Sequence, residues 1–397
     1  MAAQVTPGLT VLLEERRALV AGKRVGLLCH AASVDADLRH AAALLGGAPG
    51  VELVALFGPE HGVSGAAQDM IPVAAGAEEA VRPAAPVLHS LYGSTFASLS
   101  PTAEMLRGLD VLVIDLQDVG ARYYTFVATM GLCMAACGRA GIPVVVCDRP
   151  NPIGGALVEG GPVRAGYESF VGLYSWPQRH GCTAGELARH LAATAQAPCA
   201  LEVVPMRGWT RAMSFADTGL PWVLPSPNMP TPDTALVYPG MCLLEGTNVS
   251  EGRGTTRPFE IFGAPWIDGA RLAEALEARA LPGVRWRPLG FQPTFHKHAG
   301  QACGGVQLHV TDPAAFRPVR AGCEVLAALR ALGGDRFAWR DEAYEYVRDR
   351  LAVDLLAGGP ELRAAVDGGG DVGAVGAAWE AAAAPLREAL AAVALYG

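Results

Sequence analysis

Short apolar runs alternate with helical patterns along the first half of the chain. The apolar runs lie at 23–31, 51–60, 110–118, 142–150 and 201–206. Segments of helical length or pattern lie at 35–46, 124–141 and 182–194. Gly141 suits the end of the second segment, and Thr183 with Glu186 forms a candidate capping box at the start of the third. Continuous apolar strands alternating with helices predict a parallel sheet covered on both faces, hence a doubly wound α/β fold.

A long stretch rich in proline and glycine, about 207–258, follows this half. Loops of that length are usually functional or disordered, and three nearby tryptophans, Trp209, Trp222 and Trp266, argue against disorder. Beyond it we expect helices at 268–280, 314–332 and 341–356, strands near 284–287 and 304–311, a flexible link at 368–373 and a terminal helix at 376–395. We therefore predict two domains, 1–255 and a smaller α/β domain at 256–397.

The composition narrows the class of protein. A chain of 397 residues that is 51% hydrophobic and 18% charged is globular rather than disordered. Its net charge of -8 argues against a nucleic-acid partner and against a polybasic membrane anchor. The nine cysteines are scattered without Cys-x-x-Cys spacing, which favours buried thiols over a zinc site or disulfides. We see neither a signal-peptide pattern nor an apolar run of membrane length, so we expect a cytoplasmic protein.

Polar side chains follow four successive strands of the predicted sheet. They are Cys29 and His30, Glu60 and His61, Asp118 and Arg122, and Asp148 and Arg149. Ligands of open α/β sheets bind outside the carboxyl ends of the strands. The pattern therefore predicts one active-site crevice at this edge.

Glu60 and His61 stand in the sequence LFGPEHG, on a glycine-flanked turn after the second strand. A partly buried carboxyl group at a sheet edge suits general acid catalysis. The alternative for Glu60 is a turn or helix-capping carboxylate. His61 is either a ligand-binding donor or a packed histidine.

The two loops after the next strands offer further candidates. Asp118 and Arg122 would pair across one turn if their segment were helical, and such a pair would serve either the substrate or the loop itself. Tyr124 would pack against a sugar or in the core. Asp148 and Arg149 precede a proline-rigidified turn, as binding loops often do.

The segment EGTNVSEGRGT, residues 245–255, combines glycines with charged side chains. Glycine allows close approach of the backbone to a ligand, while Glu245, Glu251 and Arg253 supply charge. It is not a phosphate-binding P-loop, and no GxGxxG follows the first strand, which argues against a nicotinamide-dependent oxidoreductase. His296 and His298 lack an evident third ligand, so we predict no metal and no cofactor.

With these motifs assembled, the chain resembles the bacterial exo-β-N-acetylmuramidases, a glycoside hydrolase family formerly described as a domain of unknown function. The matching stretches include LFGPEHG, LDVLVIDLQDVGARYYTF, DRPNPIGG, EGGP, RHGCTAGELA, TGLPWVLPSPNMPT, YPGMCLLEGTNVSEGRGTTRPFE, GAPW and PTFHKHAGQACGGVQLHVTD. They run in order over nearly the whole chain. Two departures stand out: the first strand ends in Cys29, His30 and Ala31 instead of a Thr-Asn-Gln-like run, and Ser64 replaces a usual arginine.

The resemblance implies a Rossmann-like domain, a smaller α/β domain and an active site in the cleft between them. It implies release of N-acetylmuramic acid from the non-reducing end of peptidoglycan fragments, with Glu60 as the favoured catalytic residue. The catalytic candidates are Glu60, His61 and Glu251. The candidates for binding a muramyl-containing saccharide are Asp118, Arg122, Tyr124, Asp148, Arg149, Asn151, His180, Asn228, Glu245, Asn248 and Arg253.

Three points stay open at the level of sequence. Glycoside hydrolysis usually needs two carboxyl groups, and the second is Glu251, Glu245 or Asp118. The lactyl carboxylate of the sugar calls for an arginine, which Arg122, Arg149 or Arg253 would supply. The alternative function is a cell-wall-sugar-binding protein without catalysis, and the oligomeric state is not predicted.

Overall fold

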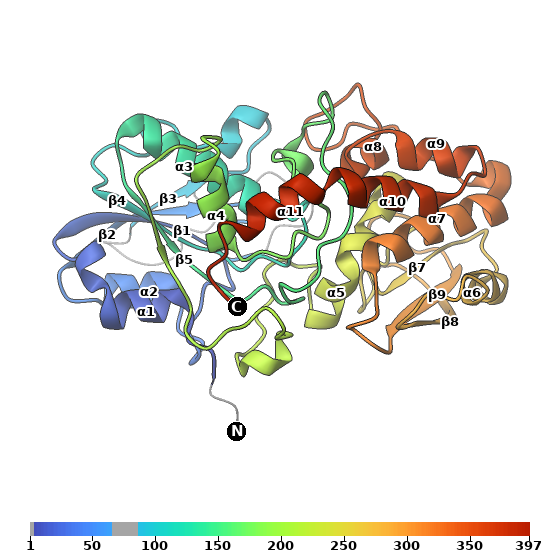
Figure 1. Cartoon of the computed structure of the whole chain (residues 1–397), viewed down its shortest axis with the longest axis horizontal. Coiled ribbons are helices and arrows are strands. Elements are labelled where there is room, and N and C mark those ends of the chain that lie inside the picture. Colours follow the sequence, from blue (N-terminus) through green and yellow to red (C-terminus); the bar gives the residue numbers. More distant parts are fainter. Residues whose placement is uncertain (1–3, 66–85) are drawn as a thin grey trace.

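A computed structural model describes residues 4–65 and 86–397 (Figure 1). In these residues, the first half forms a six-stranded parallel sheet with the order β3-β2-β1-β4-β5-β6. The strands are β1 Lys23–Cys29, β2 Val51–Gly58, β3 Val87–Ser90, β4 Val111–Asp115, β5 Val144–Cys147 and β6 Leu201–Val204. The order reverses between β1 and β4, as in Rossmann folds. The predicted doubly wound, Rossmann-like sheet is confirmed.

Alternate side chains of the central strands enter two cores on opposite faces of this sheet. Val111 and Val113 of β4 pack in the core that contains the helices α1 and α2. Leu112 and Ile114 pack in the core that contains the helices α3 and α4. These helices are α1 Gly8–Glu15, α2 Ala41–Gly46, α3 Phe126–Ala140 and α4 Ala184–Ala193. Burial on both faces explains why the strands read as unbroken apolar runs.

Local signals set the ends of α3 and α4 as predicted. Gly141 caps α3 in the left-handed conformation, with φ 69°. Thr183 and Glu186 form a capping box at the start of α4. The helix predicted at 35–46 is shorter, however, and begins only at Ala41. The Asp35 carboxylate accepts hydrogen bonds from the backbone of residues 37 and 39, and these bonds favour a turn over a helix.

The second half contains a small antiparallel sheet of order β7-β9-β8 covered by helices. Its strands are β7 Ile261–Ala264, β8 Val284–Phe291 and β9 Cys303–Val310. Its helices are α5 Pro232–Met241, α6 Gly269–Glu277, α7 Pro318–Gly333, α8 Ala352–Ala357, α9 Glu361–Asp367, α10 Val372–Ala382 and α11 Ala384–Ala391. This arrangement confirms the second α/β unit.

Three predictions for this part need correction. The irregular stretch 207–258 contains α5, which is buried on nearly every side and so lacks an amphipathic pattern. A Cβ on its Gly240 would lie 1.8 Å from the Pro318 carbonyl oxygen, so glycine is required where α5 meets α7. The helix predicted at 341–356 is the short α8 preceded by a loop, and the tail forms two helices rather than one.

The C-terminal segment returns to the first half of the molecule. In Figure 1, α10 and α11 lead back from the second half toward α4. The hydroxyl of Tyr396 donates to the Asp148 carboxylate at 2.7 Å, and the Leu395 amide donates to Glu186 at 2.8 Å. No helix among residues 4–65 and 86–397 has the length and apolar character needed to cross a membrane.

Candidate active site

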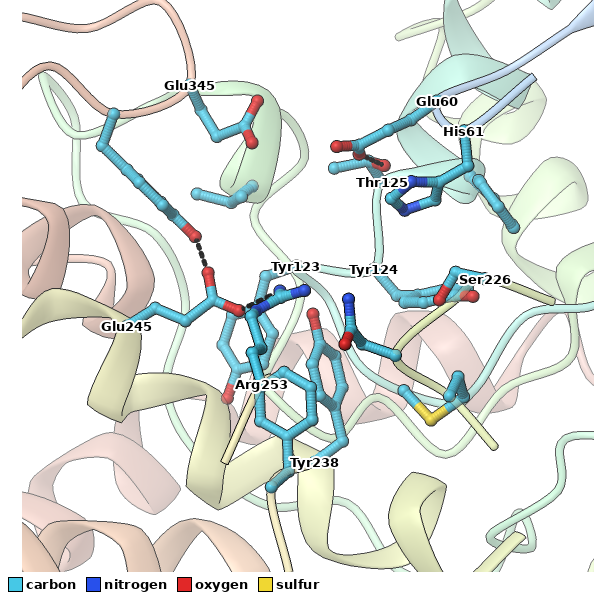
Figure 2. Close-up of a pocket in the computed structure, with 16 residues that line it drawn as sticks. Glu60, His61, Tyr123, Tyr124, Thr125, Ser226, Tyr238, Glu245, Arg253 and Glu345 are labelled. Atoms are coloured by element: carbon cyan, nitrogen blue, oxygen red, sulfur yellow. Dashed lines mark hydrogen bonds and ion pairs between the residues drawn. The ribbon is translucent and has the colours of Figure 1, made fainter. Parts of the chain in front are cut away.

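Glu60 stands in the turn after β2 with its carboxyl group buried. Its side chain is 5% exposed, and the Thr125 hydroxyl donates to its Oε2 at 2.6 Å. Figure 2 shows the other carboxyl oxygen pointing into a pocket. His61 follows in the left-handed conformation, with φ 70°, and its ring forms a T-shaped contact with Phe126 at 6.4 Å. The turn thus presents both side chains to the same space.

This pocket brings together residues from both halves of the chain. It encloses about 460 Å³ of atom-free space, including the part open to solvent. Six of the predicted site residues line it: Glu60, His61, Tyr124, Asn228, Glu245 and Arg253. The polar or aromatic lining residues that the sequence did not single out include Tyr123, Thr125, Ser226, Tyr238, Tyr344 and Glu345. Polar and aromatic side chains therefore dominate its lining.

Arg253 lies at the pocket wall in a network of carboxylates. It donates to Glu245 Oε1 at 2.7 Å, and its Nε lies 3.3 Å from Glu251 Oε1. The Tyr344 hydroxyl donates to the other oxygen of Glu245 at 2.7 Å. The guanidinium also stacks over the Phe259 ring at 5.2 Å. Both oxygens of Glu245 are thereby engaged, and Arg253 is fixed in orientation.

The comparisons with known proteins agree over nearly the whole chain. The family model "Exo-beta-N-acetylmuramidase NamZ, N-terminal" matches residues 25–233, and the corresponding C-terminal model matches residues 236–396. The chain belongs to the NamZ exo-β-N-acetylmuramidase family. The family predicted from the sequence motifs is thus confirmed.

Individual NamZ-family relatives support this assignment. The chain is 44% identical over 369 residues to the peptidoglycan β-N-acetylmuramidase NamZ of Bacillus subtilis, covering 93% of this chain and 86% of that protein. Two crystal structures of DUF1343 family proteins from Bacteroides fragilis share the fold, each over 99% of both chains. Their TM-scores are 0.88 and 0.77, at 35% and 26% identity.

Glu251, a catalytic candidate from the NamZ-family motif EGRG, lies outside the pocket lining. Burial raises its pKa, but Lys297 at 2.9 Å, His296 at 3.2 Å and Arg253 together bring the pKa well below its usual range. The carboxylate is fully buried behind Arg253. This position favours a role in holding Arg253 rather than direct contact with a sugar.

Asp118 and Arg122 do not pair, because their segment is a loop and not a helix. The Asp118 carboxylate accepts from the Gly120 amide at 2.7 Å and lies 3.2 Å from His180 Nε2. The Arg122 guanidinium donates to three backbone carbonyls, those of Gly161, Trp176 and Leu356. Burial lowers its pKa to about 10. The ion pair that a helical segment would have allowed does not form, and neither side chain lines the pocket.

The ends of β1 and β5 do not line the pocket. Arg149 forms a bidentate pair with Asp115 at 2.6 and 2.8 Å, and both side chains are buried. Asn151 donates to the Cys182 carbonyl at 2.9 Å. Arg149 lines a smaller crevice, next to Trp222, at the topological switch point. Of the four strands expected to meet at one crevice, only β2 and the segment after β4 reach the pocket.

The remaining candidates have structural partners. Asn248 donates to the Arg336 carbonyl and accepts from the Ala338 amide. His296 and His298 diverge, since His296 lies beside Glu251 while His298 contacts the Asn248 carbonyl at 2.7 Å. In the part of the chain that the structure describes, no group of three or more His, Cys, Asp or Glu side chains is arranged to hold a metal ion.

The residues that the sequence reasoning missed come mainly from 225–238 and 344–345. The sequence DEAYEYV contained a signal that these residues are not helical. Polar and aromatic residues alternate in it, whereas the predicted helix would show apolar residues at helical spacing. Tyr238 was missed because α5 is buried on nearly every side and so shows no amphipathic pattern. Both segments reach the pocket through tertiary packing.

Proposed function

We propose that this chain is an exo-acting β-N-acetylmuramidase that releases N-acetylmuramic acid from the non-reducing end of peptidoglycan fragments. The observation that carries the proposal is the buried carboxyl group of Glu60, aimed into a pocket between the two halves of a NamZ-family chain. The curated relative from Bacillus subtilis is described as a peptidoglycan β-N-acetylmuramidase.

Glu60 acts in this proposal as the general acid. One of its oxygens is held by Thr125 at 2.6 Å, while the other is directed toward the space for the sugar. The acid gives its proton to the glycosidic oxygen as the bond to C1 breaks. His61 lies next to it and lines the same pocket.

Arg253 recognises the lactyl carboxylate of N-acetylmuramic acid. It is the one arginine of the three candidates that lines the pocket, because Arg122 and Arg149 are bonded elsewhere. Its guanidinium is oriented by Glu245 and stacked on Phe259. A planar, fixed guanidinium suits a carboxylate better than a lysine would.

The lining of the pocket supports binding of a sugar. Aromatic side chains line the pocket, with Tyr123 and Tyr238 packed edge to face at 5.8 Å. Aromatic rings commonly pack against the apolar face of sugars.

The alternative of a binding protein without catalysis rested on the departures at Cys29–Ala31 and Ser64. None of these residues lines the pocket. The departures therefore give no reason to doubt catalysis, and the enzyme remains the favoured function.

The test uses two chromogenic substrates, a β-N-acetylmuraminide and the corresponding β-N-acetylglucosaminide. They differ only by the lactyl group, so the ratio of their kcat/KM values reports both the reaction and the sugar specificity. We expect turnover of the muraminide and much slower turnover of the glucosaminide. Tight binding of a muramyl disaccharide without release of free sugar would overturn the proposal in favour of the binding protein.

A further inference from the structure

Glu345 lies in the pocket opposite Glu60. Glu60 follows a strand of the first half, whereas Glu345 precedes α8 in the second half. Both carboxyl groups line the pocket and both are buried, at 5% and 4% exposure. Figure 2 shows them pointing toward each other from the two sides. Burial raises the pKa of the nearby Tyr346 to about 12, and the charges of Glu345 and Glu60 both add to that rise.

Glu345 stands at the tip of a tight and strained turn. The backbones of Tyr344 and Val347 exchange hydrogen bonds of 3.0 and 2.9 Å. Between them, Glu345 and Tyr346 have φ of 45° and 69°, in the left-handed region. Turns of this kind favour asparagine and glycine, because a side chain at these angles is strained. Such strain persists where the surroundings hold it, and it is common at functional sites.

Two tyrosines fix this turn in place. The Tyr344 hydroxyl donates to Glu245 at 2.7 Å, on the side of the second half. The Tyr346 hydroxyl donates to the Gly93 carbonyl at 2.9 Å, and its ring packs against Tyr92 of the first half. The turn is therefore anchored on both sides of the pocket, and Glu345 is held above the space between them.

The other carboxylates near the pocket hold Arg253. Glu245 bonds to Arg253 and to Tyr344. Glu251 lies outside the lining, next to Arg253 and Lys297. Glu345 is instead the carboxyl group that faces Glu60 across the pocket.

We propose that Glu345 supplies the second carboxyl group of the reaction, as the base that takes a proton from the attacking water; this rests on the proposed function. Glu60 donates its proton to the glycosidic oxygen, which keeps the electron pair of the broken bond to C1. The water oxygen bonds to C1 while one water proton passes to the Glu345 carboxylate. Glu60 ends ionised and Glu345 protonated, and exchange of one proton with solvent restores both.

The first test is Glu345→Gln, with Glu342→Gln as the matched control. We expect kcat on the muraminide to fall by about 10²–10⁴-fold, the usual contribution of a general base, while KM changes little. The acidic limb of the pH–rate profile should disappear, because the base must be ionised to act. Glu342 lies in the same loop with its side chain 73% exposed, so its variant should behave as wild type.

The second test separates catalysis from structure through Glu345→Gly. Glycine relieves the left-handed strain, so we expect a thermal midpoint equal to or above that of wild type, together with lost activity. Added azide, which needs no base, should restore turnover and yield a glycosyl azide. A lowered thermal midpoint with activity retained per folded molecule would assign Glu345 a structural role and overturn the proposal.

The outcomes also separate this proposal from the one it rests on. If wild type releases no N-acetylmuramic acid, the proposed function fails, and the role of Glu345 fails with it. If wild type is active and Glu345→Gln keeps more than about a tenth of its kcat, the assignment of Glu345 alone is overturned.

Discussion

The pocket and the switch-point end of the parallel sheet are both rich in buried charge, but they use it differently. At the sheet end, Arg149 and Asp115 bond to each other, and the Asp148 carboxylate accepts from Thr183, Gly185 and Tyr396. In the pocket, the carboxyl groups of Glu60 and Glu345 face a common empty space (Figure 2).

The difference shows what distinguishes a structural charge from a candidate catalytic one. The charged groups at the strand ends bond to other groups of the protein, so they hold loops and the C-terminal segment in place. In the pocket, by contrast, Glu60 keeps one carboxyl oxygen directed at the cavity. Burial and charge are common to both regions, and only orientation separates them. We expect substitutions in the two regions to affect different measurements.

The largest effect is expected at Glu60. Glu60→Gln removes the acid but keeps the shape, so kcat on the muraminide should fall by about 10²–10⁴-fold. The thermal midpoint should change little, since the amide oxygen can still accept from Thr125. Steady-state kinetics and thermal unfolding of the same preparation check both parts. Wild-type turnover in this variant would remove Glu60 from the mechanism.

The opposite pattern is expected at the sheet end. Arg149→Met leaves Asp115 buried without its counter-charge, which should reduce the free energy of unfolding by about 3–5 kcal/mol. Activity per folded molecule should stay within a few-fold of wild type. Denaturant unfolding and kinetics test this, and adding Asp115→Asn should recover part of the lost stability. A fall in kcat comparable to that of the Glu60 variant would show that the two regions are not separate.

A third effect concerns Asp148. Burial raises the pKa of its carboxyl group to about 6, above the value in the unfolded state. The folded state then binds more protons than the unfolded state between about pH 4 and 6, so this group's stability contribution falls as pH rises through that window. The change amounts to about 3 kcal/mol at about 1.4 kcal/mol per pKa unit. The free energy of unfolding of wild type, relative to that of Asp148→Asn, should therefore fall as the pH rises from about 4 to 6. Denaturant unfolding of both proteins measures this change.

Glu251 provides the contrasting control for this measurement. Its folded pKa is lowered by its cationic neighbours, so its contribution is present above the unfolded pKa and is lost as pH falls. The difference between wild type and Glu251→Gln should therefore shrink toward low pH. Equal slopes in the two variants would contradict the distinction between these environments.

The smallest effect is expected at Arg253. Arg253→Lys keeps the charge but loses the planar pair of donors. We expect kcat/KM for the muraminide to fall about 10–100-fold, the scale of a charge-assisted hydrogen bond, and that for the glucosaminide to change much less. Equal losses on both substrates would mean that Arg253 does not read the lactyl group.

Much of the first half could be predicted from its residues alone. The runs that became β1, β2, β4, β5 and β6 were visible because both faces of the sheet are covered. The capping box at Thr183 and the glycine at 141 are local signals that hold in the fold. The second half was harder to predict from the sequence. Helix α5 is buried on nearly all sides and shows no amphipathic pattern. Glu345 stands in a tight turn, within a stretch that is long enough for a helix.

For the site, the sequence alone pointed to Glu60, which stands in a short contiguous motif, and to the family, whose motifs run over nearly the whole chain. It did not separate Arg253 from Arg122 and Arg149, since all three are arginines in polar loops. The tertiary structure places only Arg253 of the three in the pocket lining, whereas Arg122 donates to backbone carbonyls and Arg149 donates to Asp115. It also brought Glu345 opposite Glu60, 285 positions away along the chain (345 − 60). Local patterns specify strands, caps and motifs, whereas the meeting of distant side chains depends on packing that no local pattern encodes.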